Sequence, residues 1–105
     1  MSGLTVLSFA ADRYWVAGAA SNWNNTANWS TASGGAGGAS VPGAADRAIF
    51  DANGLGNCNV DISPTLGGIQ INGYTAIIEL NGNFMTISSG NAQFSSGSLL
   101  DSPNL

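Results

Sequence analysis

Charged side chains are scarce in this chain: they make up 8% of its 105 residues, against roughly a quarter in an average soluble domain. Arg13 and Arg47 are the only basic residues, and the formal net charge is −4. A nucleic-acid-binding surface needs a basic patch that displaces counterions from phosphates. Two arginines cannot form one, so we expect no nucleic-acid partner. A polar but uncharged surface is typical of fibres, shells and adhesins, because few charged groups must be desolvated when such subunits pack.

Histidine and lysine are absent altogether. The first absence excludes His-based triads and His-containing metal sites. The second excludes Schiff-base chemistry and the lysine of a phosphate-binding loop. Paired carboxylates serve glycoside hydrolysis, but no two carboxylates of this sequence stand at a defined spacing. The sequence therefore predicts a protein that is not an enzyme and has no catalytic residue, no metal site and no cofactor.

The segment from Asp51 to Gly56 is similar to the start of a calcium-binding loop. An EF-hand loop needs a bidentate glutamate at its last position, which here is Ile62. An Asx-type turn after a strand that ends at Phe50 explains the same residues. We therefore expect a turn rather than a calcium site.

Cysteine and long apolar runs are also lacking. Cys58 is the only cysteine, which excludes an intramolecular disulfide, and we expect it to be a small buried residue. The longest apolar stretch, residues 4–11, is too short to cross a bilayer, and no basic segment precedes it as in a signal peptide. We predict no membrane association and an extended N-terminal arm over residues 1–12. The expected assembly interface consists of this arm and the adjacent aromatic pair: Leu4, Val6, Leu7, Phe9, Tyr14 and Trp15.

Residues 13–105 are expected to form a single β domain. Residues 31–46 are rich in Gly, Ala and Ser and predict a loop, because glycine costs backbone entropy and nothing large is there to pack. No sustained helical apolar stripe appears, so the predicted fold class is all-β. Instead, apolar residues recur as alternate-position pairs, each the inward face of a short strand. The pairs are Val60/Ile62, Ile69/Ile71, Ile78/Leu80, Met85/Ile87 and Ala92/Phe94.

Two architectures fit this pattern. Asn72-Gly73, Asn81-Gly82 and Gly90-Asn91 tolerate the positive φ of tight turns. As two-residue hairpins, the Asn-Gly turns predict a small β-sandwich with antiparallel strands. The same units predict a short, β-helix-like β-solenoid if three of them make one turn of roughly 23–27 residues. The sequence leaves both architectures open.

A block rich in tryptophan and asparagine follows the arm. Tryptophan faces stack on sugar rings and asparagine amides bond hydroxyl groups, so the candidate glycan-binding residues are Trp23, Trp29, Asn24 and Asn28. The competing interpretation is structural: the tryptophans form a hydrophobic plug that caps one end of the fold, and the asparagines serve turns.

Four blocks occur in the order seen in a module of phage virion proteins and large bacterial surface proteins, which they resemble: RYWVAG at 13–18, NWNNTANWS at 22–30, SGGAGGASVP at 33–42 and ADRAIFDANG at 45–54. GYTAIIELNG at 73–82 is similar to the repeats that follow in that module. The resemblance covers residues 13–90 and implies a β-helix-like fold with a non-enzymatic role on a particle surface or fibre. Members of the module continue for many turns, whereas this sequence has 105 residues. The resemblance therefore implies a chain that trimerises or coats something larger.

The resemblance implies a phage virion structural protein, and a capsid decoration or cement protein fits a short chain best. The implied partners are further copies of the chain, with a trimer as one form, and other virion proteins such as the major capsid protein. The implied location is the virion, on the capsid surface or the tail. The alternative is a tail-fibre or adhesin module that binds surface glycans, which would place the chain outside or on the surface of a cell.

Overall fold

The computed structural model describes residues 9–95 and 98–100, and the all-β prediction is confirmed for them. Short strands and turns dominate, and the single 3₁₀ turn, η1, covers Thr26–Asn28. The strands are β1 (Asp12–Trp15), β2 (Ser21–Asn22), β3 (Trp29–Ser30), β4 (Arg47–Phe50), β5 (Cys58–Asn59), β6 (Thr65–Ile71), β7 (Ile77–Glu79), β8 (Thr86–Phe94) and β9 (Ser98–Leu100).

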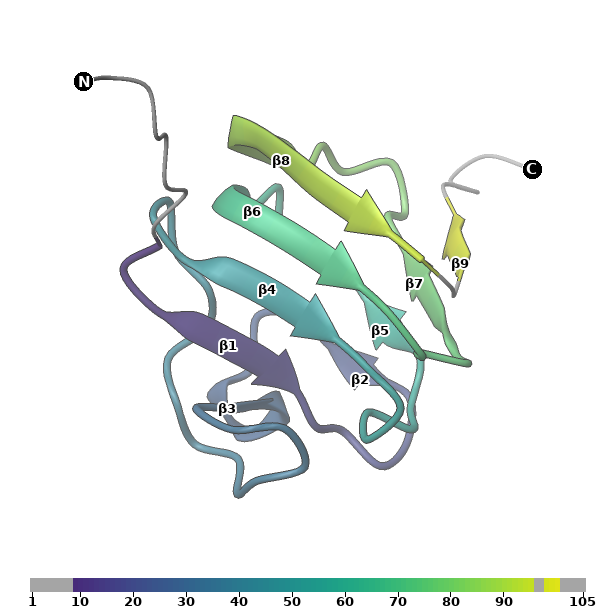
Figure 1. The fold of residues 1–105 in the computed structure, drawn as a ribbon. Helices are drawn as coiled ribbons and strands as arrows, with labels where there is room; N and C mark the ends of the chain where they lie inside the picture. Colours follow the sequence, from purple (N-terminus) through teal and green to yellow (C-terminus); the bar gives the residue numbers. More distant parts are fainter. Residues whose placement is uncertain (1–8, 96–97, 101–105) are drawn as a thin grey trace.

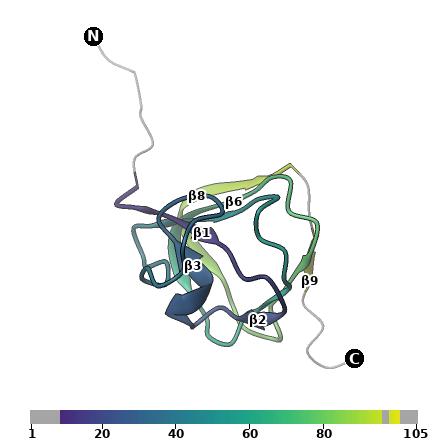
Figure 2. The same ribbon diagram turned by 90° about the horizontal axis from the view of Figure 1, so that it is seen from below.

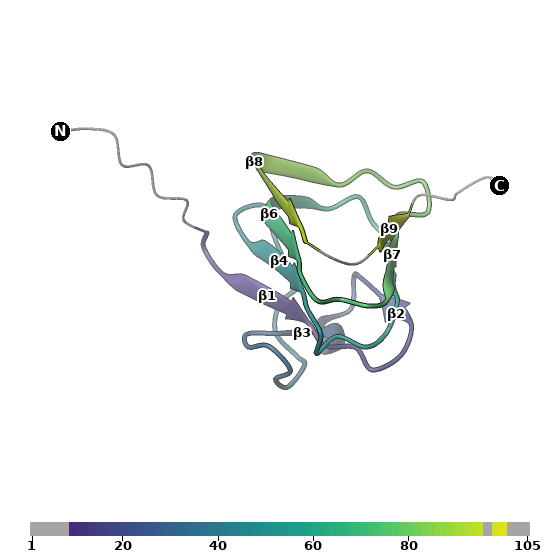
Figure 3. The same ribbon diagram turned by 45° about the vertical axis from the view of Figure 1, so that its right-hand side comes forward.

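The strands form two sheets that do not close into a barrel. One sheet has the order β3-β1-β4-β6-β8 and the other the order β2-β5-β7-β9. After β4 each successive strand joins the opposite sheet, and the two sheets lie on opposite sides of the molecule (Figures 1 and 3). Seen along the stack of strands, the chain winds around one interior, which buried side chains from both sheets fill (Figure 2).

Neighbouring strands are parallel, with β1 and β3 as the one antiparallel pair among the described strands. Ile49 of β4 pairs with Gln70 of β6, and Cys58 of β5 pairs with Ile78 of β7, so one passage around the interior takes 21 or 20 residues. These two pairs give a period slightly shorter than the sequence pattern predicts, whereas Ile69 of β6 and Ala92 of β8 pair at a spacing of 23 residues, within the predicted range. The first passage is longer because η1, β3 and the glycine-rich loop lie within it.

The two Asn-Gly turns form as predicted, but they do not make hairpins. The turn predicted at Gly90-Asn91 is wrong, because both residues lie within β8, where Asn91 pairs with Gly68 of β6. Gly73 has φ +83°, and Asn81 and Gly82 have φ +54° and +81°. Asn72-Gly73 lies between β6 and β7, and Asn81-Gly82 lies between β7 and β8. Each turn therefore connects strands of different sheets. The antiparallel hairpins expected for the sandwich alternative are not found among the described residues.

The predicted loop at 31–46 carries no strand and closes the β1 end of the molecule. Its backbone bonds to the preceding segment, with the N–H of Gly38 donating to the carbonyl of Thr26 and the N–H of Ala39 to that of Trp29. A Cβ at Gly37 would overlap the backbone of Ala27. Glycine is therefore needed here for close approach between two backbone segments.

Most of the predicted inward pairs lie in the core. Val60, Ile69, Ile71 and Ile78 are buried, and Cys58 is buried as expected. Side chains in the loops and in the last turn pack against this core and are partly buried: Ile62, Leu80, Met85 and Ile87. Ala92 and Phe94 are the exception, because both are exposed.

The boundary between arm and domain differs from the prediction of residue 12. Asp12 is the first residue of β1 and pairs with Arg47. The N–H of Ala10 donates to the carbonyl of Ala45, and the carbonyl of Ala11 accepts from the N–H of Arg47. Residues 9–12 thus belong to the β domain, because the β4 edge and the loop before it supply partners for their backbone groups. Residues 1–8 of the predicted arm lie outside the described residues.

Candidate functional site

A buried aromatic cluster lies in the interior, with rings from β1, β3 and β4. Trp15, Trp23, Trp29 and Phe50 are each 0% exposed. The ring centroids of Trp29 lie 5.3 Å from Trp15, 4.8 Å from Trp23 and 5.6 Å from Phe50, mostly edge to face. Tyr74 extends the cluster, with its ring 5.2 Å from that of Phe50. Such offset and edge contacts are the favoured geometry for aromatic rings.

The polar groups of this cluster are satisfied inside the protein with one exception. The indole N–H of Trp15 and the hydroxyl of Tyr74 both donate to the carbonyl of Gly56, at 2.9 and 2.7 Å. The indole N–H of Trp29 donates to the carbonyl of Trp23 at 2.8 Å. The indole N–H of Trp23 is buried and has no acceptor among the described residues.

The structure does not present the candidate glycan-binding residues as a sugar platform. Trp23 and Trp29 are fully buried, so neither ring face is open to stack on a sugar. The amide of Asn28 donates to Ser21 Oγ and to the carbonyl of Asn22, both at 2.8 Å. Only Asn24 is exposed, and its backbone N–H donates to the Asp61 carboxylate. The structural interpretation fits instead, because the tryptophans are the core of the capped end.

The candidate interface residues are divided by the structure. Leu4, Val6 and Leu7 lie outside the described residues. Trp15 is buried in the aromatic cluster and is not available to a partner, which corrects its assignment. Phe9 and Tyr14 are half-buried, so parts of both rings face outward.

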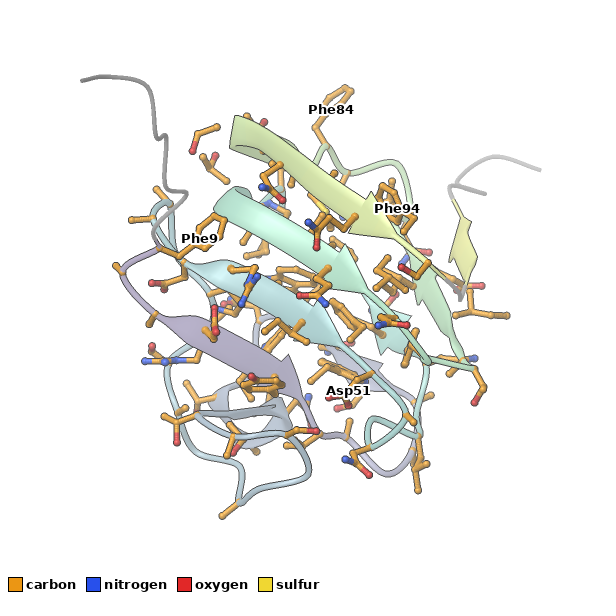
Figure 4. The ribbon with its side chains drawn as sticks, in the orientation of Figure 1. Phe9, Asp51, Phe84 and Phe94 are labelled. Atoms are coloured by element: carbon orange, nitrogen blue, oxygen red, sulfur yellow. The ribbon has the colours of Figure 1, made fainter. Side chains whose placement is uncertain are left out.

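Phe9 is anchored on the outer face of the first sheet (Figure 4). A Cβ at Gly68 would lie 2.8 Å from Cε1 of the Phe9 ring, so the ring covers the space that this glycine leaves open. The guanidinium carbon of Arg47 lies 5.2 Å from the ring centroid, a cation–π contact. The same guanidinium donates to both carboxylate oxygens of Asp12 at 3.0 Å, and this bond raises the pKa of Arg47. Gly68, Arg47 and Asp12 therefore fix the position of the Phe9 ring on the outer face of the first sheet.

Replacing Gly68 with alanine is expected to displace the Phe9 ring while leaving the fold intact, because the nearest obstacle is the end of a movable side chain. The expected loss is about 1 kcal/mol, mainly the cation–π contact and the burial of one ring edge. Hydrogen exchange should show faster exchange at the Ala10 amide, which bonds to Ala45. Gly18→Ala is the matched control, because nothing lies within 4 Å of a Cβ at Gly18. Unchanged exchange at Ala10 in Gly68→Ala would mean that the ring does not hold the segment.

A buried thiol and a buried phenol hydroxyl make the stability of the fold depend on pH in the alkaline range. Burial raises the pKa of the Cys58 thiol, and burial also raises the pKa of the Tyr74 hydroxyl. In the unfolded chain these groups titrate near their ordinary values, about 8.5 and 10. Above those values the unfolded chain binds fewer protons than the folded protein, so the free energy of unfolding falls as pH rises.

We expect the free energy of unfolding to fall by about 1.4 kcal/mol per pH unit as the pH rises above the thiol's unfolded pKa. Tyr74 adds a similar slope above about pH 10. Urea unfolding followed by circular dichroism over this pH range measures the slope. Cys58→Ala should remove the part below pH 10, and a variant that keeps it would show that another group is responsible.

An asparagine ladder runs up the second sheet and was not predicted from the sequence. The amide of Asn59 donates to the side-chain oxygen of Asn22 at 2.7 Å, and the amide of Asn81 donates to that of Asn59. Asn22 and Asn59 are register partners in β2 and β5. Asn22 and Asn59 end β2 and β5, whereas Asn81 lies in the turn after β7, so the sequence shows no regular spacing that would reveal the ladder.

The turn at Asp51 is the Asx-type turn expected. One carboxylate oxygen accepts from the backbone N–H of Asn53 at 3.0 Å, and the other accepts from the Ser33 hydroxyl at 2.6 Å. Asp51 thereby joins the glycine-rich loop to the segment after β4. Within residues 9–95 and 98–100 no group of three or more potential metal ligands occurs.

The described part of the chain contains no detectable pocket. No helix among these residues has the length and apolar character needed to span a bilayer. The chain matches no family model, no curated protein and no solved structure. The resemblance to phage virion and bacterial surface modules therefore stays a prediction from the sequence blocks.

Proposed function

We propose that the chain is a non-enzymatic structural protein of a phage virion, a capsid decoration protein that binds the particle surface in many copies. The fold we assign to it is a short β-solenoid, supported by the parallel register and the repeat of 20 to 23 residues between stacked positions. Its partners are the major capsid protein and further copies of the chain. Its location is the virion.

The observation that carries this proposal is the anchoring of Phe9, the first described residue. The Phe9 ring packs against Gly68 and Arg47, so the residue that follows the predicted docking segment 1–8 has a fixed position on the domain. Residues 1–8 include Leu4, Val6 and Leu7 and carry no charged side chain. A short apolar, uncharged segment is suited to strand addition on a neighbouring protein, in which main-chain bonds give affinity and alternate side chains fill pockets.

The scarcity of charged residues also supports a role in binding a particle surface. Only 8% of the residues are charged, so a large contact with a shell desolvates few charged groups. The alternative glycan-binding role has no comparable support. Trp23 and Trp29 are buried, and the amide of Asn28 donates hydrogen bonds within the protein.

Mass spectrometry of gradient-purified particles of the phage that encodes the chain tests the proposal. The chain should be present at a copy number comparable with that of the major capsid protein. Its absence from the particles would overturn the proposal, and a few copies per particle would place it in the tail instead of on the capsid.

Rebinding to particles that lack the protein tests the role of the arm. A chain that starts at Phe9 should keep the circular dichroism spectrum and melting temperature of the full chain but fail to bind. A full-length variant with Leu4, Val6 and Leu7 changed to serine is the matched control for length, and it should fail in the same way. Normal binding of either variant would contradict docking through residues 1–8.

A further inference from the structure

The two ends of the stacked strands are built differently. At one end the antiparallel β3, η1 and the glycine-rich loop 31–46 cover β1 and the aromatic cluster. At the other end β8 and β9 are the last strands of their sheets (Figure 1). Among the described residues no strand follows them. We call this second end the open end.

Side chains that would be core in any other turn are exposed at the open end. Phe50, Ile71 and Phe94 are register partners in β4, β6 and β8, so their side chains point to the same side of the sheet. Phe50 and Ile71 are 0% and 1% exposed, whereas Phe94 is 57% exposed. The difference arises because β6 stacks next to Phe50 and β8 stacks next to Ile71, whereas no described strand stacks next to Phe94.

A second large apolar residue reinforces this patch. Phe84 lies in the turn between β7 and β8 and is 79% exposed. Figure 4 shows Phe84 and Phe94 at the same β8 end of the molecule. Met85 and Ile87, nearby on the chain, are only partly buried against the core. The open end therefore combines the edge of a sheet with exposed apolar side chains.

The β8 edge carries few of the features that keep sheet edges apart. Natural edge strands are protected by lysine, proline, inward charges or bulges. β8 has one irregularity, where Leu66 and Gly68 of β6 pair with Ile87 and Asn91 of β8. From Asn91 to Phe94 the strand is regular, and no charged residue occurs between Leu80 and Leu100.

We propose that the open end binds the open end of a second copy of this chain, with the two β8 strands side by side. A two-fold axis perpendicular to β8 reverses the strand direction, so the two edges form an antiparallel pair, as an isologous interface requires. The phenylalanines of both copies then lie in one shared apolar interface. This inference does not depend on the virion role.

A second copy fits this end better than other partners. A partner that binds by charge complementarity gains nothing here, because every charged residue of the described chain lies at or before Glu79. Two copies in this arrangement bring no charged residue of β8 or of the turn before it together, in spite of a net charge of −4 each. Head-to-tail stacking is excluded, because β3, η1 and the glycine-rich loop cover the opposite end.

Sedimentation equilibrium of the full chain over a concentration series tests the proposal. The expected mass is that of two chains of 10.5 kDa at micromolar concentration. Phe94→Asp places an unpaired carboxylate of each copy in the apolar interface and should weaken association at least about 100-fold. Leu55→Asp is the matched control, because Leu55 is 67% exposed and its N–H bonds to Ala17 in the first turn, away from β8.

Phe84→Asp gives the same test in a residue without a ladder partner, should Phe94→Asp unfold the chain. Both aspartates should leave the circular dichroism spectrum unchanged. A monomer at 100-fold above the proposed range, a trimeric mass, or equal weakening by Leu55→Asp would overturn the proposal. Loss of the dimer on removal of residues 1–8, with Phe84→Asp and Phe94→Asp still dimeric, would assign the contact to the arm and overturn it as well.

Discussion

Alanine in place of Trp29 is expected to remove a large share of the stability of the fold. Trp29 is fully buried and touches the rings of Trp15, Trp23 and Phe50, so its removal opens a cavity in the middle of the aromatic cluster. A buried Trp→Ala substitution costs about 3–5 kcal/mol, and a domain of this length has a total stability of about 5–15 kcal/mol. The small core has few other large side chains to compensate.

Urea unfolding followed by circular dichroism measures this effect. The midpoint should fall by about 2 M or more, or the transition should be absent, given a slope of about 1–3 kcal/mol per molar urea for small proteins. A midpoint within the error of the unchanged protein would show that the aromatic cluster is not what holds the capped end.

Two phenylalanine substitutions provide the matched comparison. Trp29→Phe removes one of two donors to the Trp23 carbonyl, because the N–H of Asn25 still donates to it. Trp23→Phe removes an indole N–H that has no acceptor among the described residues. Losing one hydrogen bond costs about 0.5–1.5 kcal/mol, whereas removing a buried unpaired donor relieves a cost of about 1–3 kcal/mol. Trp23→Phe should therefore be the milder change of the two, and equal losses would indicate that the Trp23 N–H does find a partner.

Alanine at position 56 is expected to be the most damaging single-methyl change in the chain. A Cβ on Gly56 would overlap the backbone carbonyl of Ala19, which cannot swing aside as a side chain can. The Gly56 N–H donates to Ala17, and its carbonyl accepts from both Trp15 and Tyr74. Any backbone shift that relieves the overlap therefore disturbs the aromatic cluster, and we expect a loss of about 3 kcal/mol or more.

Gly18→Ala is the control for this change, because it adds the same methyl group with nothing within 4 Å. It should be neutral or raise stability by about 0.4–1 kcal/mol through the unfolded chain. Thermal unfolding of the two variants side by side measures the contrast. Similar melting temperatures for Gly56→Ala and Gly18→Ala would contradict the close approach between the two backbone segments.

Much of the local structure could be predicted because it depends on neighbours in the sequence. Alternation in a strand places every second side chain on one face, so Val60, Ile69, Ile71 and Ile78 could be recognised as core residues. The turns at Asn72-Gly73 and Asn81-Gly82 follow from the backbone freedom of these residues. The charge-poor composition could be read directly.

The candidate sites were harder to predict, because exposure depends on distant segments. Trp23 and Trp29 have the composition of a sugar platform, yet both are buried, with the ring of Trp15 in β1 against Trp29 and the ring of Phe50 in β4 against Trp23. The ladder of Asn22, Asn59 and Asn81 joins residues more than 20 positions apart in sequence. Neither feature is visible until the register of the sheets is known.

The sequence by itself therefore determined the strands, the Asn-Gly turns and the low content of charged residues, since each depends on composition or on local backbone geometry. The tertiary structure alone decided which strands pair and in which direction. The Asn-Gly turns would suit a hairpin equally well. They connect the two sheets here because each short strand pairs in parallel with the strand about 20 residues further along the chain. It also decided what is buried: Ile69/Ile71 and Ala92/Phe94 follow one pattern, but only the first pair has another strand stacked on it.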